Sequence, residues 1–349
     1  MKKAALAGAA AVAMLALTGV LPSPAAPTPL ASASTGTDVK VASFNIQSVS
    51  LDQTNGNRQP WTERRGKVIA ELMSEHPDVI GVQEANPSYS YPTRLVDGPT
   101  QYFDLRNGLN KAGGNYQLTN TVPYNCVNAR SNYKCVYQYR GASWGDRILY
   151  NRDTIDLVRS GSTLYSVQGA GVDKRYIAWA VLSVKATGHT FLFVGTHPRG
   201  DASQRGAQLN QLVSRINALK QGRPVVAVGD FNTQKFDPFA ATLLPKMRNN
   251  GYGDVLNQEY AVNPVRQPRA QSTVDAWINS YNHLNRAVDQ WSYSQRRDKT
   301  GNMIDYVFAT NSLPVRRFRL VLDYDASTLQ VNGVFPSDHN MITATLTMP

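Results

Sequence analysis

Short apolar runs of strand length recur along the chain, and each is bounded by polar residues at one end or both. Their richness in Val, Ile and Phe is typical of β-strands. We predict seven strands: VASFN (41–45), DVIGVQE (78–84), DRILY (146–150), FLFVGTH (191–197), PVVAVGDFN (224–232), MIDYVF (303–308) and MITATLT (341–347).

Helical periodicity lies between some of these strands. Within 202–220, five apolar residues recur at helical spacing: Leu209, Leu212, Val213, Ile216 and Leu219. A second helix is predicted before the strand at 78, on four residues: Val68, Ile69, Leu72 and Met73. Strands and helices thus alternate in part, while 114–150 and 250–300 are rich in loop-forming residues. The pattern predicts an α/β layered protein with mixed sheets, in a single domain over residues 34–349.

Polar residues stand at the strand ends, where burial of an unpaired group is costly. They are Asn45, Glu84, His197, Asp230, Asn232, Asp338 and His339. Because ligands of α/β folds bind beyond the carboxyl ends of strands, we expect these side chains to converge on one site. The other histidines, His76, His189 and His283, have no such context and are predicted to be surface residues.

Composition and the absence of certain motifs reduce the number of protein classes and reactions that fit the chain. The 349 residues are 42% hydrophobic and 17% charged, which indicates a globular chain, and the net charge of +11 favours a polyanionic partner. Two cysteines exclude a disulfide-built scaffold and a four-cysteine zinc site. The absence of GxxxxGK[ST], GxSxG and HExxH motifs leaves NTPases, serine hydrolases and zinc peptidases unsupported. The oxygen-rich strand ends suit a hard cation, Mg²⁺, Ca²⁺ or Mn²⁺, and hydrolysis of a phosphate ester.

The first 33 residues have the pattern of a secretory signal peptide. Lys2 and Lys3 precede an apolar run over 4–21, and Ala31, Ser32 and Ala33 supply small residues for cleavage. We therefore expect a secreted, extracellular protein; the alternative is an uncleaved membrane anchor. In an oxidising compartment, Cys126 and Cys135 are expected to form a disulfide, the alternative being two buried free thiols.

Seven segments together resemble the endonuclease/exonuclease/phosphatase superfamily, which includes pancreatic-type deoxyribonucleases, AP endonucleases and neutral sphingomyelinases. In chain order they are SFNIQ (43–47), GVQEAN (81–86), GDRILYNRD (145–153), VGTHP (194–198), VGDFNT (228–233), IDYVF (304–308) and SDHN (337–340). The resemblance, to a secreted bacterial-type member, implies a four-layer α/β sandwich with two facing mixed β-sheets flanked by helices. It places the active site at one edge of these sheets.

The resemblance also implies residue roles. Glu84 is the expected principal metal ligand, with Asn45 and Asp338 near the same metal. Asp230 and Asn232 would contact the attacking water or leaving oxygen and the scissile phosphate. The remaining roles fall on His339 as base or phosphate contact, Asp305 as its partner, His197 as second histidine, and Arg175 and Tyr150 as substrate-phosphate contacts. AP endonucleases carry a lysine where this chain has Asn86, which disfavours that branch.

The resulting hypothesis is a secreted, divalent-metal-dependent phosphodiester hydrolase, an extracellular nuclease acting as a monomer without an evident protein partner. Five arginines are candidate contacts for nucleic-acid phosphates: Arg140, Arg147, Arg175, Arg199 and Arg205. One alternative is a sphingomyelinase or phospholipase C-like lipid phosphodiesterase at an anionic membrane surface; another is a non-catalytic polyanion-binding protein. Six aromatic residues suit a membrane interface, base stacking or simple packing: Tyr116, Tyr124, Tyr133, Tyr137, Tyr139 and Trp144.

Overall fold

Two mixed β-sheets form the centre of the structure, a computed structural model that describes residues 36–52, 56–169, 173–256, 268–290 and 301–349. The predicted signal peptide, 1–33, lies outside these residues. No helix within the described ranges has the length and apolar character needed to cross a bilayer.

The first sheet contains seven strands. They are β1 (Thr37–Asn45), β2 (Val79–Gln83), β3 (Tyr116–Leu118), β4 (Arg147–Asn151), β10 (Ala270–Val274), β12 (Val315–Val321) and β15 (Met341–Met348). Their order is β10-β12-β15-β1-β2-β4-β3. Within it β1 runs parallel to β2 and antiparallel to β15, so the sheet is mixed.

The second sheet contains six strands. They are β5 (Ile155–Leu164), β6 (Tyr176–Val184), β7 (Thr190–Thr196), β8 (Val225–Asp230), β9 (Tyr252–Asp254) and β11 (Asp305–Thr310). Their order is β5-β6-β7-β8-β11-β9, with β7 parallel to β8 and the other neighbouring pairs antiparallel. A separate hairpin pairs β13 (Tyr324–Asp325) with β14 (Gln330–Val331).

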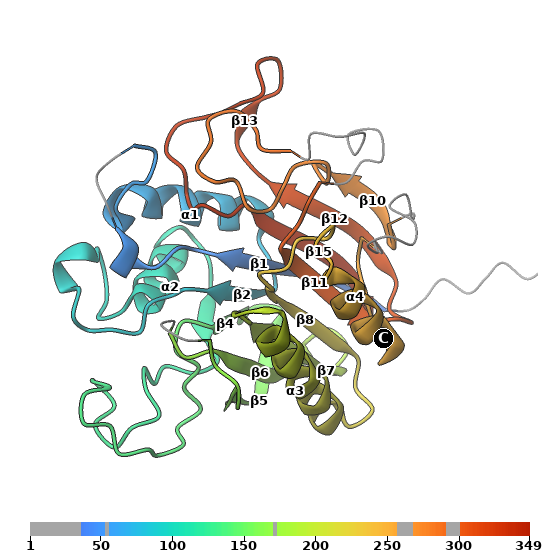
Figure 1. Ribbon diagram of the computed structural model, residues 1–349, viewed down its shortest axis with the longest axis horizontal. Helices are drawn as coiled ribbons and strands as arrows, with labels where there is room; N and C mark the ends of the chain where they lie inside the picture. The colour runs from blue at the N-terminus through green and yellow to red at the C-terminus, as the bar shows by residue number, and fades with distance from the viewer. Residues whose placement is uncertain (1–35, 53–55, 170–172, 257–267, 291–300) are drawn as a thin grey trace, which may run out of the picture. The chain divides into compact units, whose positions relative to one another are not determined.

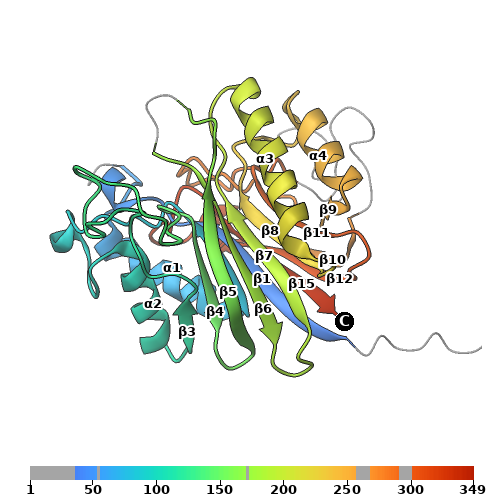
Figure 2. The ribbon, with the colours of Figure 1, turned by 90° about the horizontal axis from the view of Figure 1, so that it is seen from below.

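Helices cover the outer faces of the two sheets. They are α1 (Trp61–Glu75), α2 (Gln101–Lys111), α3 (Ala202–Lys220) and α4 (Ala240–Asn249), with short 3-10 turns at Val49–Leu51 and Pro92–Arg94. Figure 2 shows α1 and α2 on one side of the strands and α3 and α4 on the other, and Figure 1 shows α3 crossing the second sheet. Asp201 begins α3 with a capping box in which Gln204 is the reciprocal partner.

The buried apolar residues fall into three layers. Val226 and Val228 of β8 point between the sheets, whereas Val225 and Ala227 point outward to α3 and α4, as the two-residue period of a strand requires. A third cluster lies between the first sheet and helices α1 and α2. Three apolar layers separate four layers of secondary structure, which confirms the predicted four-layer α/β sandwich.

Strand register brings the polar strand ends to one edge. Asn45 is opposite Gln83 in the β1–β2 pair, so Glu84 follows immediately beside it. In the second sheet, Asp305 is directly opposite Asp230. Thr196 is opposite Gly229 in the β7–β8 pair. The residues that follow them, His197 and Asp230, therefore lie at the same edge.

Two glycines allow the two sheets and their strands to approach closely at this edge. A β-carbon on Gly81 would lie 2.4 Å from Val228 Cγ2, across the gap between the sheets. A β-carbon on Gly229 would lie 2.0 Å from the carbonyl oxygen of Thr196. Real β-carbons do not come this close, so larger residues would push apart the strands that carry Glu84 and Asp230.

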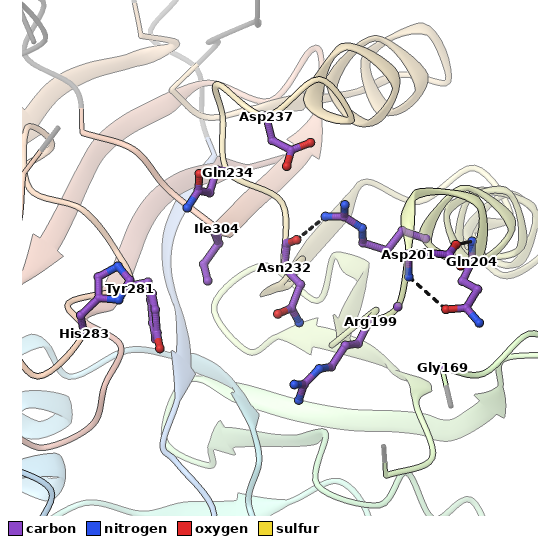
Figure 3. A pocket seen from close by; sticks show the side chains of 12 residues that line it. Gly169, Arg199, Asp201, Gln204, Asn232, Gln234, Asp237, Tyr281, His283 and Ile304 are labelled. Atoms are coloured by element: carbon purple, nitrogen blue, oxygen red, sulfur yellow. Dashed lines mark hydrogen bonds between the residues drawn. The ribbon is translucent and has the colours of Figure 1, made fainter. Parts of the chain in front are cut away.

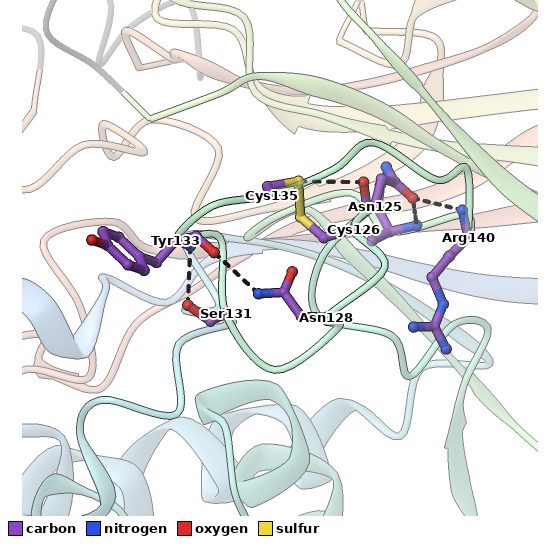
Figure 4. Close-up of a disulfide and its surroundings, with 8 residues drawn as sticks. Asn125, Cys126, Asn128, Ser131, Tyr133, Cys135 and Arg140 are labelled. Carbon is purple, nitrogen blue, oxygen red and sulfur yellow. Dashed lines mark hydrogen bonds between the residues drawn. A yellow bond between two sulfur atoms is a disulfide. The ribbon is translucent and has the colours of Figure 1, made fainter.

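The segment 119–146, here called the disulfide segment, extends away from the sheets without regular strands (Figure 1). Cys126 and Cys135 form a disulfide with a Cα–Cα distance of 5.2 Å, which confirms the predicted pairing. Asn125 accepts hydrogen bonds on Oδ1 from the backbone N–H groups of Arg140 and Ala142, at 2.9 and 3.0 Å (Figure 4). A disulfide and one buried amide therefore stabilise a segment that forms no regular strand.

Candidate active site

Asn45 lies at the centre of the converging strand ends. Its buried Nδ2 donates hydrogen bonds to Glu84 Oε1 and to Asp230 Oδ2, both at 3.2 Å. His339 Nε2 lies 3.4 Å from the same nitrogen. One amide thus links the two sheets, and the structure brings together four of the residues predicted to form the site.

Glu84 turns inward because its backbone leaves the strand in the left-handed region, with φ at 60°. Such a conformation is strained for a residue with a β-carbon and is common at functional sites. The Ser48 backbone N–H donates to Glu84 Oε2 at 3.2 Å, so both carboxylate oxygens are held. Glu84 is therefore a rigidly placed, half-buried acidic group.

Arg175 fixes the tautomer of His197. Arg175 NH1 lies 2.7 Å from His197 Nδ1, and a guanidinium can only donate, so Nδ1 must accept. The ring proton is then on Nε2, which lies 3.1 Å from Asp230 Oδ2 and donates to it. Arg175 therefore acts through His197 here, although its own Nε has no hydrogen-bond partner within the described residues.

Asp230 is a buried acceptor of several hydrogen bonds. Besides Asn45 and His197, the Asn232 backbone N–H donates to its Oδ1 at 2.8 Å. Burial opposes the charged form, but the imidazoles of His197 and His339 and these hydrogen bonds lower the pKa of Asp230 below its ordinary range. Asp230 is thus an anion across the physiological pH range, able to orient a water molecule.

His339 and Asp305 form a buried pair. His339 Nδ1 lies 2.9 Å from Asp305 Oδ2, which holds the ring and leaves Nε2 facing Asp230 at 3.7 Å. Burial opposes the charged ring, yet the carboxylates of Asp305 and Asp230 raise the pKa of His339 to about 10. In this arrangement His339 is an imidazolium, suited to contact a phosphate oxygen.

Asp338 lies beside this centre but faces another partner. Its Oδ2 is 3.5 Å from Arg58 NH2, and Ser337 Oγ donates to its Oδ1 at 3.3 Å. No contact between Asp338 and Glu84 is present in the described structure. The metal role expected for Asp338 therefore stays a prediction.

Two hollows flank the centre and share Arg199. The larger, about 760 Å³, is lined by Asn232, Arg205, Tyr281 and His283 among others (Figure 3). The smaller, about 260 Å³ and here called the Glu84 hollow, is lined by Glu84, Asn86, Asp146, Lys174, Arg175 and neighbouring residues. The site is therefore an open depression on both sides of the buried cluster.

Two expected substrate contacts lie elsewhere. Tyr150 is opposite Val79, at the far end of β2 from Glu84, and packs against the core between the sheets, so the structure does not bring it to the site. Arg147 is buried and donates to the carbonyl oxygens of Trp144, Val122 and Pro123. The expectation of a phosphate contact from Arg147 was wrong, because its guanidinium is used to hold the disulfide segment.

The set of aromatic residues also divides. Tyr116 is buried and donates to the Pro77 carbonyl oxygen at 2.9 Å, and Tyr124 is buried against Trp144. Tyr133, Tyr137 and Tyr139 are exposed. Tyr116 thus packs as an ordinary core residue and Tyr124 packs against Trp144, while the other three rings are open to solvent. The prediction that His76, His189 and His283 are surface residues is confirmed.

The sequence prediction missed Asp146 and Tyr281. Asp146 stands at the start of β4, a strand end like the others, so the same positional signal identifies it; burial raises its pKa to about 6. Tyr281 forms an isolated bridge with His339, and the two ring centroids are 5.0 Å apart. Nothing in the local sequence around Tyr281 indicates this contact, because it comes from a loop in the 250–300 region.

The structure is a four-layer α/β sandwich with a cluster of carboxylate, amide and imidazole side chains at one edge of its sheets. The sequence matches the endonuclease/exonuclease/phosphatase family over residues 42–339, and the chain belongs to that family. It is 24% identical to Nocturnin of Drosophila melanogaster in an alignment of 338 positions that covers 87% of this chain and 46% of Nocturnin. The chain thus spans about half the length of that relative.

Solved structures share the fold. A mannosyl-6-phosphatase of Bacteroides thetaiotaomicron superimposes with a TM-score of 0.60 at 18% identity, covering 89% of this chain and 100% of the other. TDP2 of D. rerio, complexed with a single-stranded DNA product, gives a TM-score of 0.54 at 14% identity and covers 89% and 100%. At these identities the likeness extends to the fold alone.

Proposed function

We propose that this protein is a divalent-metal-dependent nuclease that hydrolyses phosphodiester bonds in nucleic acids and acts outside the cell. The observation that carries the proposal is the pair of open hollows on either side of the buried cluster, which suits a chain that continues in both directions from the scissile phosphate. Lys174, Arg199 and Arg205 line these hollows, and the chain has a net charge of +11. A small monoester would need only one closed pocket.

The site residues fit a hard divalent cation such as Mg²⁺, Ca²⁺ or Mn²⁺. Glu84 offers a carboxylate to the Glu84 hollow, and Asp305 Oδ1 is a buried oxygen with no hydrogen-bond partner among the described residues. Glu84 and Asn45 would hold the ion, with Asp338 as a further expected ligand. When bound, the ion would polarise the phosphate and offset its negative charge.

The chain's own residues supply the remaining chemistry. Asp230, an anion held by Asn45, His197 and Asn232, orients the attacking water and accepts its proton. His339, held by Asp305, places positive charge beside a nonbridging phosphate oxygen. His197 keeps its proton on Nε2 through Arg175, and so maintains the orientation of Asp230. Because the groups are buried and mutually hydrogen-bonded, they need little rearrangement during the reaction.

Lipid phosphodiesters are the second candidate class. Val127, Tyr133 and Val136 of the disulfide segment are 63–73% exposed, and apolar side chains on a protruding segment suit a membrane surface. The nucleic-acid proposal takes precedence because cations line the hollows beside the reacting centre, whereas this apolar tip lies outside them.

A substrate panel tests the proposal. Protein lacking residues 1–33 is incubated with supercoiled plasmid, single-stranded DNA, RNA, mannose 6-phosphate and sphingomyelin vesicles, each with Mg²⁺ or with EDTA. We expect metal-dependent cleavage of nucleic acid and at least a hundredfold slower turnover of the other substrates. Faster release of phosphate from mannose 6-phosphate, or of phosphocholine from vesicles, would contradict it.

A further inference from the structure

A third hollow of about 160 Å³ lies between the disulfide segment and the start of β6, and the nuclease mechanism does not use it. Here called the aromatic hollow, it is lined on several sides by rings: Tyr124, Tyr137, Trp144 and Tyr176. Cys126 and Cys135 also line it, so the disulfide forms part of its wall. A hollow walled by aromatic rings suits a flat ligand group, because planar rings stack on one another.

The aromatic hollow adjoins the reacting centre. It shares Trp144 and Lys174 with the Glu84 hollow. The backbone N–H of Ala85 donates to the carbonyl oxygen of Gly145 at 3.0 Å, so the segment carrying Trp144 is tied directly to the residue after Glu84. A β-carbon on Gly145 would lie 3.2 Å from the Glu84 Cα, which leaves no room for other chain between them.

The residues at the start of β6 line both hollows. Arg175 points to His197 and lines the Glu84 hollow, Tyr176 lines the aromatic hollow, and Lys174 between the two hollows lines both. Three consecutive residues therefore place the Arg175 guanidinium at the reacting centre, and the Lys174 ammonium and the Tyr176 ring at the aromatic hollow beside it.

The charge of the surrounding segment matches a polyanion. Residues 116–145 contain Arg130, Lys134 and Arg140 but no Asp or Glu. Lys174 lies where the aromatic hollow and the Glu84 hollow meet, and the lining of the Glu84 hollow also includes Asp146 and Asp173. Cations beside stacking platforms are the usual composition of a surface that binds single-stranded nucleic acid.

We propose that the aromatic hollow is a base-binding subsite, which stacks a nucleobase of single-stranded nucleic acid next to the scissile phosphate. This inference rests on the proposed nuclease function and deepens it. The subsite requires an unpaired base, because a base inside a duplex cannot enter a ring-lined hollow without leaving the stack. It therefore makes single strands, or frayed ends, the favoured substrate class.

Tyr137 offers the test with a matched control. Tyr137 is 66% exposed and lines the aromatic hollow, whereas Tyr133 is 73% exposed on the same segment and does not line it. The variants Tyr137→Ala, Tyr137→Phe and Tyr133→Ala are compared on a labelled single-stranded oligonucleotide. A second set of oligonucleotides carries one abasic residue, moved one position at a time past each cleaved bond.

We expect Tyr137→Ala to raise KM about 5- to 150-fold with little change in kcat, the range that loss of one stacked base predicts. Tyr137→Phe and Tyr133→Ala should stay within about twofold of wild type. An abasic residue at one position should raise the wild-type KM by a similar factor. It should have no further effect in Tyr137→Ala, because the same stacking contact is already lost.

Other outcomes distinguish failure of the base-binding subsite from failure of the nuclease proposal. Wild-type cleavage with no difference between Tyr137→Ala and Tyr133→Ala, or with no abasic position effect, would overturn the subsite and leave the nuclease intact. If wild type cleaves no nucleic acid, both proposals fall. Binding to phosphatidylglycerol vesicles that both Tyr→Ala variants weaken equally, with DNA cleavage unchanged, would replace the subsite with a membrane-docking segment.

Discussion

The reacting centre and the disulfide segment are built in opposite ways. At the centre, strand register places each side chain: Asp305 is opposite Asp230, and Asn45 is opposite the residue before Glu84. The disulfide segment has no strand partner beyond an isolated bridge, Cys126 to Tyr137, and is held by a disulfide and a buried arginine. Residues that carry out the reaction thus sit on the rigid sheets, and the proposed substrate selection sits on a connecting segment.

Loss of the His339–Asp305 pair should cause the largest fall in kcat. The change should affect the reacting centre and leave the disulfide segment unaltered. We expect His339→Ala to lower kcat about 10²- to 10⁴-fold, because a charged group beside the phosphate is lost. Asp305→Asn should lower it less, since the ring remains but loses its anionic partner. Cleavage rates on one oligonucleotide measure both, with circular dichroism to verify folding. Near-wild-type turnover of His339→Ala would remove this residue from the mechanism.

Arg147 connects the two regions and should govern stability. Arg147 donates to three backbone carbonyl oxygens and lies over the Tyr102 ring at 4.2 Å. Arg147→Ala leaves these buried acceptors unpaired, and we expect a loss of roughly 3–5 kcal/mol in the free energy of unfolding. Urea denaturation measures it, with Arg140→Ala on the exposed part of the segment as control. Equal stability of the two variants would show that Arg147 does not anchor the segment.

Removal of the disulfide should lower stability and weaken substrate binding by the disulfide segment, without changing kcat at the reacting centre. The variant Cys126→Ser with Cys135→Ser should lose up to about 2.5–3 kcal/mol, the chain-entropy value for so short a loop. Its kcat on a small phosphodiester should match wild type, while KM for single-stranded DNA rises. Reductant should reproduce the effect in wild type and leave the variant unchanged. A hundredfold fall in kcat would mean that the two regions are not independent.

Glu71 lies away from both regions, and its ionisation should cause a smaller, pH-dependent change in the free energy of unfolding. Burial raises the pKa of Glu71 to about 8, and neither carboxylate oxygen has a hydrogen-bond partner within the described ranges. The folded state holds this proton more tightly than the unfolded state, whose pKa is near 4.5, so stability falls as pH rises through this interval. Between pH 5 and 6.5, wild type should lose about 2 kcal/mol relative to Glu71→Gln. Parallel stability curves for the two proteins would contradict this, and kcat should be unchanged.

Much of the fold follows from local sequence pattern. All seven predicted strands and both predicted helices are present, because the strands are short apolar runs buried on both faces and each helix has an apolar face of helical period. The strand β5 was missed because it is an edge strand with mixed exposure, and α4 because it contains Pro245. Such elements owe their structure to neighbours that are distant in sequence, which single-sequence patterns do not contain.

The candidate site was predictable to the extent that strand ends converge. Asn45, Glu84, Asp230, Asp305, His197 and His339 are joined by the hydrogen bonds and close contacts described above. The prediction for Tyr150 failed because β4 runs antiparallel to β2, so the carboxyl end of β4 lies away from the site. The Arg58 partner of Asp338 and the ring lining of the aromatic hollow depend on loop contacts, which no spacing rule in the sequence reveals.

The most direct test of the central claim is nicking of supercoiled plasmid by wild type and by Asp230→Ala, purified identically from residue 34 onward. Asp230 lies where hydrogen bonds from both sheets meet, so the account predicts nicking by wild type with Mg²⁺, none with EDTA, and a loss of at least about 10²-fold in the folded variant. Nicking by Asp230→Ala at the wild-type rate would contradict the assignment of this cluster as the catalytic centre.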